Sequence, residues 1–174
     1  MATLRLITRP ARGLKSFLDV PGLYGVSLDE VIAQHRLPID RDDAWDIATL
    51  AVDPSYRQGM LSLALFQVIC TLARSAGVGA LVSIVEVPVI RMIQAKFGSP
   101  FERFPGLDPV PYLGSPACVP VWTTGELLAQ RVSAKDPELW DFLSLGEGLE
   151  PAFSRPEWAA FGASLRAATL EHRG

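Results

Sequence analysis

The sequence predicts an α/β protein in which helices cover a mixed β-sheet, and three observations lead to this expectation. Strand-like apolar runs cover residues 47–52 and 80–85, and a stretch of helical period at 60–76 joins them. The order strand, helix, strand, helix, strand, strand continues to residue 122. Finally, 174 residues with 49% hydrophobic side chains supply enough apolar material for one folded core.

Composition excludes several classes of function. The net charge is −3 and the sequence contains no cluster of basic residues, so nucleic acid is not expected as a partner. No apolar run reaches the ~20 residues that span a bilayer, and the first residues do not form a secretory signal. Cys70 and Cys118 lack the pairing typical of metal ligands. We therefore expect a reduced, cytoplasmic protein without a metal site.

The chain opens with a strand and a long connection. Residues 2–8 alternate well enough between polar and apolar side chains to form a strand. The connection that follows, 14–44, is of a length that is usually functional. One helix is predicted within it at 28–36, because Ser27 and Glu30 form a capping box in front of an apolar face.

One strand–loop–helix unit organises the chain. The strand 47–52 stops at Asp53 and Pro54, since proline cannot donate to a β-ladder. A polar loop containing Gly59 then leads into the helix at 60–76. This order brings free backbone N–H groups together at the positive end of the helix, an arrangement that suits a phosphate group.

The remaining chain continues the sheet and adds helices. The sequence predicts, in order, a strand at 80–85, a helix at 89–97 behind Pro88, strands at 101–104 and 117–122 joined by a connector at 105–116, and helices that begin near Thr123, Asp136 and Ser154. Residues 1–122 would form the core domain, and residues 123–174 a helical extension packed on it.

The segment Leu50-Ala-Val-Asp-Pro-Ser-Tyr-Arg57 resembles the acyl-CoA-binding signature of the GCN5-related N-acyltransferase (GNAT) superfamily. In that superfamily the loop after the fourth strand holds the cofactor pyrophosphate. The resemblance implies a thioester donor, either acyl-CoA or the phosphopantetheine of an acyl-carrier protein. The residues it implies for donor binding are Leu50, Ala51, Val52, Arg57, Gln58, Gly59, Met60, Leu61 and Ser62.

Later segments resemble one branch of the superfamily. Residues 89–100, Arg103-Phe-Pro-Gly and the strand through Val119-Pro-Val121 are similar to the C-terminal half of the acyl-homoserine-lactone (autoinducer) synthases and of the long-chain N-acyl amino acid synthases. The similarity covers about residues 2–122 and starts at the family's third strand. The first two strands of the family have no counterpart, so S-adenosylmethionine is not expected as a cofactor.

Two carboxylates are candidates for a general base. Asp46 takes the position of the family's glutamate on the fourth strand, and Glu86 ends the next strand, where parallel strands present ligands. Each has an alternative interpretation as a satisfied carboxylate at a strand end or helix N-terminus. Gln94 stands where many acetyltransferases of the superfamily carry a tyrosine that acts as the general acid. Tyr112 is either a general acid on a loop or a residue whose aromatic ring is simply packed against its neighbours.

The resemblance implies an N-acyltransferase that moves an acyl group, not restricted to acetyl, from a thioester donor to a small amine. The rival hypothesis is a non-catalytic remnant of such an enzyme that binds acyl-CoA or a partner protein. A first strand at the sheet edge would also allow a homodimer. Binding of CoA without turnover, or a dimer through residues 2–8, would favour the rival.

Overall fold

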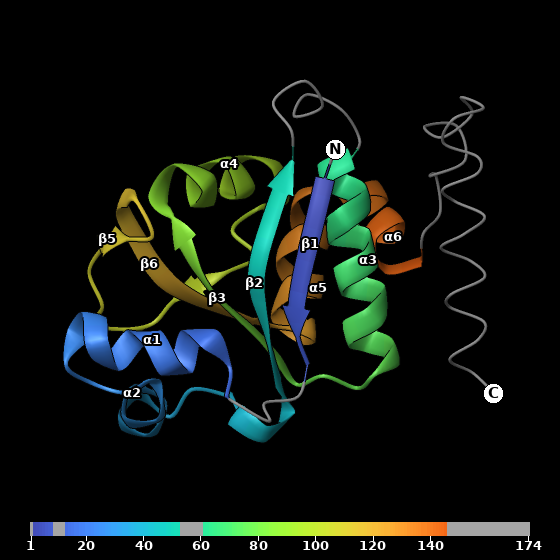
Figure 1. Cartoon of the computed structure of the whole chain (residues 1–174). Helices are drawn as coiled ribbons and strands as arrows, with labels where there is room; N and C mark the ends of the chain where they lie inside the picture. The colour runs from blue at the N-terminus through green and yellow to red at the C-terminus, as the bar shows by residue number, and fades with distance from the viewer. Residues whose placement is uncertain (1, 9–12, 53–60, 146–174) are drawn as a thin grey trace.

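A mixed six-stranded sheet lies at the centre of the structure (Figure 1). The computed structural model describes residues 2–8, 13–52 and 61–145. The strand order is β1-β2-β3-β6-β4, and β5 pairs with β6 beside this path. β2 and β3 run parallel, and the other pairs are antiparallel. The strands are β1 Ala2–Ile7, β2 Ala44–Val52, β3 Ala80–Glu86, β4 Glu102–Arg103, β5 Val110–Tyr112 and β6 Ser115–Thr124.

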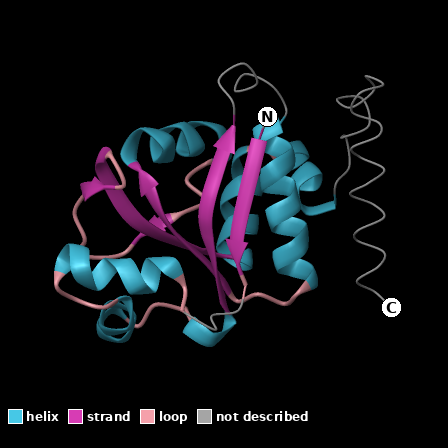
Figure 2. Cartoon of the chain, in the orientation of Figure 1, coloured by secondary structure: helices cyan, strands magenta, loops and turns pink. Residues whose placement is uncertain are grey.

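Helices cover both faces of this sheet (Figure 2). α1 and α2 pack on one face, which we call the α1 face. α3, α4 and α5 share a core cluster on the opposite α3 face, and α6 packs against α3 and α5. The helices are α1 Lys15–Tyr24, α2 Leu28–His35, α3 Leu61–Ser75, α4 Val87–Phe97, α5 Gly125–Lys135 and α6 Pro137–Leu145, with a short 3-10 turn at Arg41–Asp43 before β2.

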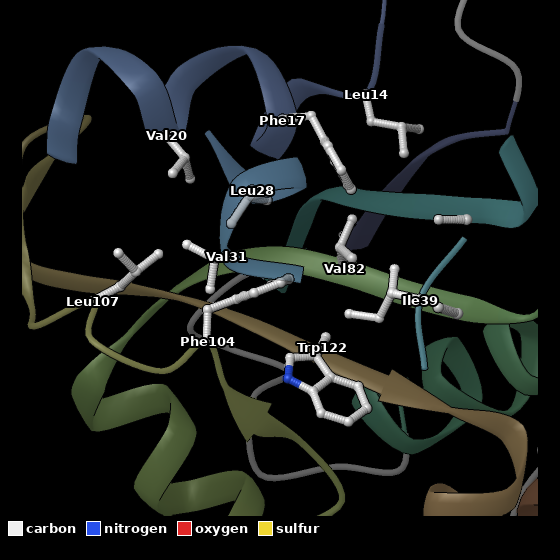
Figure 3. Packing of buried hydrophobic residues seen from close by; sticks show 12 residues of the cluster. Leu14, Phe17, Val20, Leu28, Val31, Ile39, Val82, Phe104, Leu107 and Trp122 are labelled. Atoms are coloured by element: carbon white, nitrogen blue, oxygen red, sulfur yellow. The ribbon is translucent and has the colours of Figure 1, made fainter. Parts of the chain in front are cut away.

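Apolar side chains from α1 and α2 fill the α1 face (Figure 3). Leu14, Val20 and Leu28 are fully buried. They share one core cluster with Val82 of β3 and with Phe104, which follows β4. Burying a leucine or valine side chain stabilises a fold by roughly 1.5–3 kcal/mol relative to leaving it exposed. This cluster therefore fixes both helices on the sheet.

The sequence predicts one helix in the connection before β2, but the structure has two. Pro21 and Gly22, residues that locally disfavour a helix, lie inside α1. A proline in a helix interior costs about 3 kcal/mol through a lost hydrogen bond and a clash. Phe17 and Val20 nevertheless bury their side chains on one face of α1, and this packing outweighs the local preference. Gly25, with φ 71°, ends the helix in the left-handed conformation.

The capping box predicted for the second helix is confirmed. The Glu30 N–H donates to the hydroxyl of Ser27 at 3.2 Å, and the Ser27 N–H donates to the Glu30 carboxylate at 2.7 Å. The predicted strand 2–8, helix 60–76, strand 80–85 and helix 89–97 likewise correspond to β1, α3, β3 and α4. β2 begins at Ala44 rather than at residue 47.

Two predictions about the second half were wrong. The connector 105–116 contains β5, which turns back into β6 through Leu113 and Gly114, both at positive φ (47° and 85°). Turns of this kind favour asparagine or glycine at the first position, so leucine gave no hairpin signal. The N-cap of α5 is Thr124 and not Thr123, because the Thr124 hydroxyl accepts a hydrogen bond from the Leu127 N–H at 3.1 Å.

Several expectations lie beyond what the structure describes. The helix predicted to begin near Ser154 and the loop after β2 fall outside the described residues. The division into a core of residues 1–122 and an extension of 123–174 stays a prediction. Among the described helices, none combines the length and apolar character needed to cross a membrane.

Two C-cap glycines give a test of the packing between α4 and α5. Gly98 and Gly25 have similar positive φ, 76° and 71°, but a Cβ on Gly98 would lie 2.8 Å from the Arg131 carbonyl oxygen, whereas nothing lies within 4 Å at Gly25. We expect Gly25→Ala to lower the free energy of unfolding by about 1–2 kcal/mol from the left-handed conformation alone. Gly98→Ala should cost more, since α5 must also shift. Urea unfolding followed by circular dichroism measures both, and equal losses would contradict the close helix approach.

Candidate functional site

β2 and β3 diverge into a V that opens towards their C-terminal ends (Figure 1). Among the described residues these two strands pair at three positions, the last being Asp46 with Val82. Beyond it, β2 continues to Val52 along β1, and β3 continues to Glu86 along β6. We call the space between the diverging strands the V.

A β-bulge explains why the strands separate at this point. Arg5 of β1 pairs with Thr49, whereas the next residue, Leu6, pairs with Ile47, so Ala48 is an extra residue in β2. A bulge bends its strand and increases the local twist. It therefore turns β2 away from β3 immediately after their last pair.

Two buried polar contacts fix the base of the V. The Ser83 hydroxyl donates to the Ile47 carbonyl oxygen at 2.8 Å and so bridges β3 and β2 where their ladder ends. On the α1 face the Asp46 carboxylate accepts a hydrogen bond from the Ser16 N–H at 2.5 Å. Asp46, which is only 1% exposed, thereby satisfies one of the free N–H groups at the start of α1.

The surroundings of Asp46 shift its titration. Burial raises the pKa of the Asp46 carboxyl, while hydrogen bonds from Ser16 and the charge of Lys15 oppose this shift, and the charge of Asp19 adds to it. A pKa closer to neutral suits a general base. The structure gives Asp46 a clear role as a cap for α1. Its role as a base stays a prediction.

Glu86 lies at the other end of the V. It is exposed, it ends β3, and it occupies the N-cap position of α4 without a side-chain capping bond. Side chains alternate along a strand, and Asp46 pairs with Val82, so Asp46 and Glu86 lie on the same face of the sheet. The four residues from Val82 to Glu86 span roughly 13 Å. The two candidate general bases therefore lie at opposite ends of the V, and their carboxylates are too far apart to share one proton.

The residues predicted to bind the donor lie on or after the outer part of β2. Leu50, Ala51 and Val52 belong to the part of β2 that pairs with β1 beyond the last pair with β3. α3 begins at Leu61, with Ser62 in its first turn. β2 therefore leads to the N-terminus of α3, as the predicted strand–loop–helix unit requires. The other predicted donor residues, Arg57, Gln58, Gly59 and Met60, lie outside the described residues.

Two neighbouring cavities lie on the α3 face instead of in the V. The larger one, about 420 Å³, lies between the end of α3, the starts of β3 and α5, and Trp140 of α6. The smaller one, about 20 Å³, lies beside Ile47 at the base of the V. Cys70, Leu81 and Leu128 line both cavities, so the two are adjacent. Their linings are mainly apolar.

The free cysteines are not placed to act as nucleophiles. Burial raises the pKa of the Cys70 thiol to about 12, so the thiol stays protonated at neutral pH. Cys118 is buried on β6. Within residues 2–8, 13–52 and 61–145, no three His, Cys, Asp or Glu side chains gather where a metal ion could bind.

Several contacts near the V were not predicted from the sequence. Ser83 is a single serine in a buried strand, and Ser16 acts through its backbone, so neither gives a sequence signal. Tyr112 contacts Lys15 and Asp19 of α1, a helix that was not predicted. If residues 14–24 had been predicted as a helix, Lys15 and Asp19 would have been one turn apart, and this spacing would have indicated their contact.

Known structures share this fold. The chain is similar to FeeM, an N-acyl amino acid synthase from uncultured soil microbes, with a TM-score of 0.53 and 15% identity over 75% of this chain and 64% of that one. Similarity extends to BjaI, a CoA-dependent acyl-homoserine lactone synthase (TM-score 0.49, 16% identity, 76% and 58% of the two chains). It also extends to a Bacillus subtilis acetyltransferase in complex with CoA (TM-score 0.38, 10% identity, 70% and 99%). No protein-family model and no curated protein sequence matches the chain.

The described chain has a GNAT-like fold, as the sequence resemblance predicts. The mixed sheet and the helices that flank it match this fold. An N-acyl amino acid synthase is among the solved structures that share the fold, and the chain spans about 64% of its length.

The buried Asp46 carboxylate generates a pH-dependent prediction. Because its folded-state pKa is raised above the ordinary value of 3.8, the wild type should lose stability as pH rises from 3.8 through the folded pKa, and then level off. Asp46→Asn lacks this titration, so its stability relative to the wild type should increase over the same window. Urea unfolding between pH 3.5 and 8 measures this, and a difference that stays constant with pH would contradict it.

A second variant separates the cap from the charge. Asp46→Ala leaves the Ser16 N–H without its acceptor, and in the same urea experiment it should be less stable than Asp46→Asn by about 1–3 kcal/mol at every pH, since neither variant titrates.

Proposed function

We propose that the protein is an N-acyltransferase that transfers an acyl group from an acyl thioester to an amine. The observation that carries the proposal is the V between β2 and β3 in a sheet with the GNAT fold. Backbone groups on the V side of β2 beyond Asp46 are not paired with β3 in the described ladder. Since buried backbone groups require partners, an extended ligand with amide groups would complete this edge.

The pantetheine arm of the donor has this chemistry. In the proposed complex its amides pair with the backbone of Leu50, Ala51 and Val52, and its phosphates bind at the start of α3. Helix N-termini favour anions because of their free N–H groups and the helix dipole. Arg57, Gln58, Gly59, Met60, Leu61 and Ser62 are the residues we propose for the phosphates. Both CoA and an acyl-carrier protein present this arm, and both are donors of the cytoplasm, where we place the reaction.

The transfer needs little covalent chemistry from the protein. The amine nitrogen forms a bond with the thioester carbonyl carbon, and the C–S bond breaks. The leaving thiolate takes up one proton, and the proton lost by the ammonium form of the acceptor passes to a base. A strand N–H beside the carbonyl would stabilise the oxyanion. Asp46 and Glu86 remain the two candidate bases, and their distance means that only one would contact a given acceptor.

The cavities on the α3 face support an acyl chain longer than acetyl. A thioester carbonyl held in the V would lie close to Ile47, and the smaller cavity starts at this residue. The larger cavity lies next to it, between α3, α5 and α6. Apolar linings of this kind favour hydrocarbon, since each buried methylene contributes about 0.8 kcal/mol.

One observation favours the non-catalytic alternative. The Asp46 carboxylate is buried and already bonded to Ser16, so it is less available to an acceptor than an exposed base would be. A protein of this kind would bind acyl-CoA without turnover. The choice between the two functions therefore depends on a direct activity measurement.

Thiol release tests the catalytic proposal. The chain is incubated with acetyl-, octanoyl- and dodecanoyl-CoA or the matching carrier proteins, together with a panel of amines. We expect release that depends on the amine and that falls by about 100-fold or more in Asp46→Asn or Glu86→Gln, whichever removes the base. Glu138→Gln, an exposed carboxylate on α6, is the matched control. Calorimetric binding of acyl-CoA without any release would support the non-catalytic alternative.

A volume change in the cavities tests the acyl-chain site. Leu128→Trp adds bulk where the two cavities meet, so kcat/KM should fall for dodecanoyl donors and remain nearly unchanged for acetyl-CoA. Met92→Trp, at an exposed position on α4, should change neither value. If both donors lose activity in parallel, the cavity is not the chain site.

A further inference from the structure

A cation and a helix N-terminus lie at the surface end of the larger cavity on the α3 face. Arg74, in the last turn of α3, lines the cavity and is exposed. Thr124 and Gly125, the N-cap and the first residue of α5, also line it. Ala80 and Leu81 of β3, which complete this part of the wall, are buried. The cavity therefore runs from solvent into the core, and its outer end is positively charged.

Arg74 is available to a ligand. It forms no ion pair with any residue of the described chain, where the paired cations are Lys15, Arg41 and Arg131. Its charge opposes the rise that burial causes in the pKa of the Cys70 thiol, a group that lines the same cavity. No acidic side chain is among the described residues of the lining. An anion at the outer end would therefore meet a cation without a competing carboxylate.

The start of α5 adds to the attraction for an anion. The Thr124 hydroxyl accepts a hydrogen bond from the Leu127 N–H at 3.1 Å, and other N–H groups of the first turn have no partner within the helix. The positive end of the helix dipole lies at the same point. Glu126 belongs to this turn, but it is exposed and does not line the cavity. Arg74 and the helix terminus, from two different elements, thus favour the same ligand charge.

The rest of the cavity suits a hydrocarbon chain. Its volume of about 420 Å³ lies within the range of roughly 300–1,000 Å³ that small-molecule sites occupy. Most of the side chains that line it are apolar, among them Ala73, Val78 and Leu128, and Trp140 of α6 adds an aromatic ring. Removing a hydrocarbon chain from water into such surroundings is favourable. The cavity therefore combines an apolar interior with a cationic outer end.

We propose that the larger cavity binds a free fatty acid, with the carboxylate at Arg74 and the start of α5 and the chain among the apolar side chains. A guanidinium presents paired N–H donors that match the geometry of a carboxylate. A fatty alcohol lacks the charge that Arg74 recognises, and a fatty amine carries the opposite charge. The site is defined by the cavity and its outer end, so it does not depend on acyl transfer.

The site has a consequence for the proposed acyl transfer. The same apolar volume is proposed above for a long acyl chain of the donor. A free fatty acid and a long acyl chain would therefore exclude each other from the larger cavity, whereas an acetyl group is too short to compete. In an active acyltransferase, a bound fatty acid would inhibit the use of long-chain donors selectively.

Three ligands of equal chain length test the recognition of charge. Decanoate, 1-decanol and decylammonium are titrated into the full chain at neutral pH, below their micelle concentrations, and binding is followed by calorimetry. The wild type should bind decanoate about 10-fold more tightly than decanol, as expected for one charge-assisted hydrogen bond. It should bind decylammonium more weakly than decanol. Equal affinities for decanoate and decanol, or no binding of decanoate, would overturn the proposal.

Variants of the cation separate recognition from stability. Arg74→Gln should lower the affinity for decanoate about 10-fold and leave that for decanol within about twofold, whereas Arg74→Lys should retain part of the preference. Lys96→Gln removes an exposed cation from the last turn of α4, outside the cavity, and should change neither affinity. If Arg74 only stabilises the C-terminal end of α3, Arg74→Gln will lower the free energy of unfolding without altering the preference. That result would contradict the site.

NMR spectroscopy locates the bound ligand. Trp140 lines the cavity, so its indole N–H signal, assigned with Trp140→Phe, should shift on addition of decanoate. Leu128→Trp fills the cavity and should weaken the binding of decanoate and decanol alike. Binding of decanoate that leaves the Trp140 signal unchanged would place the ligand elsewhere and overturn the site. Because no thioester is used, these measurements can support the site even if acyl transfer fails, and the reverse.

Discussion

The hydrogen bond between the Ser16 N–H and the buried Asp46 carboxylate is the contact on which the arrangement of the V depends. Asp46 lies at the last pair of β2 and β3, so the same carboxylate marks the base of the V and fixes the start of α1. The bulge at Ala48 and the Ser83 hydroxyl act at the same level of the sheet. A buried charge is costly unless it is bonded. This position is therefore sensitive to any change in α1.

Much of the fold could be predicted from local patterns. The capping box at Ser27 and the helical period of α3 need only a few neighbouring residues, and both were recognised. α1 was missed because Pro21 disfavours a helix through local effects that the sequence shows. The burial of Phe17 that compensates for Pro21 depends on β-strands far along the chain, and the local sequence does not show these contacts. The hairpin at Leu113 was missed for a similar reason, since its backbone conformation is unusual for leucine.

The candidate site was predictable only in part. Resemblance to the superfamily pointed to Asp46 and to the strand before α3, and the structure places both beside the V. It could not reveal that the partner of Asp46 is a backbone N–H, because every residue except proline has one. Nor could it reveal the contact of Tyr112 with Lys15, which depends on two elements that were not predicted. Long-range pairing of polar groups has no local sequence pattern.

The placement of α1 and α2 between β1 and β2 has a consequence for the order of folding. The two strands are neighbours in the sheet, but their pairing closes a long loop, and the entropy of closure must be overcome before the ladder contributes. α1 and α2 share a hydrophobic core with β3 and β6, which gives them an independent reason to assemble. The first segment of the chain should therefore join late, and its amides should be among the first to exchange with solvent.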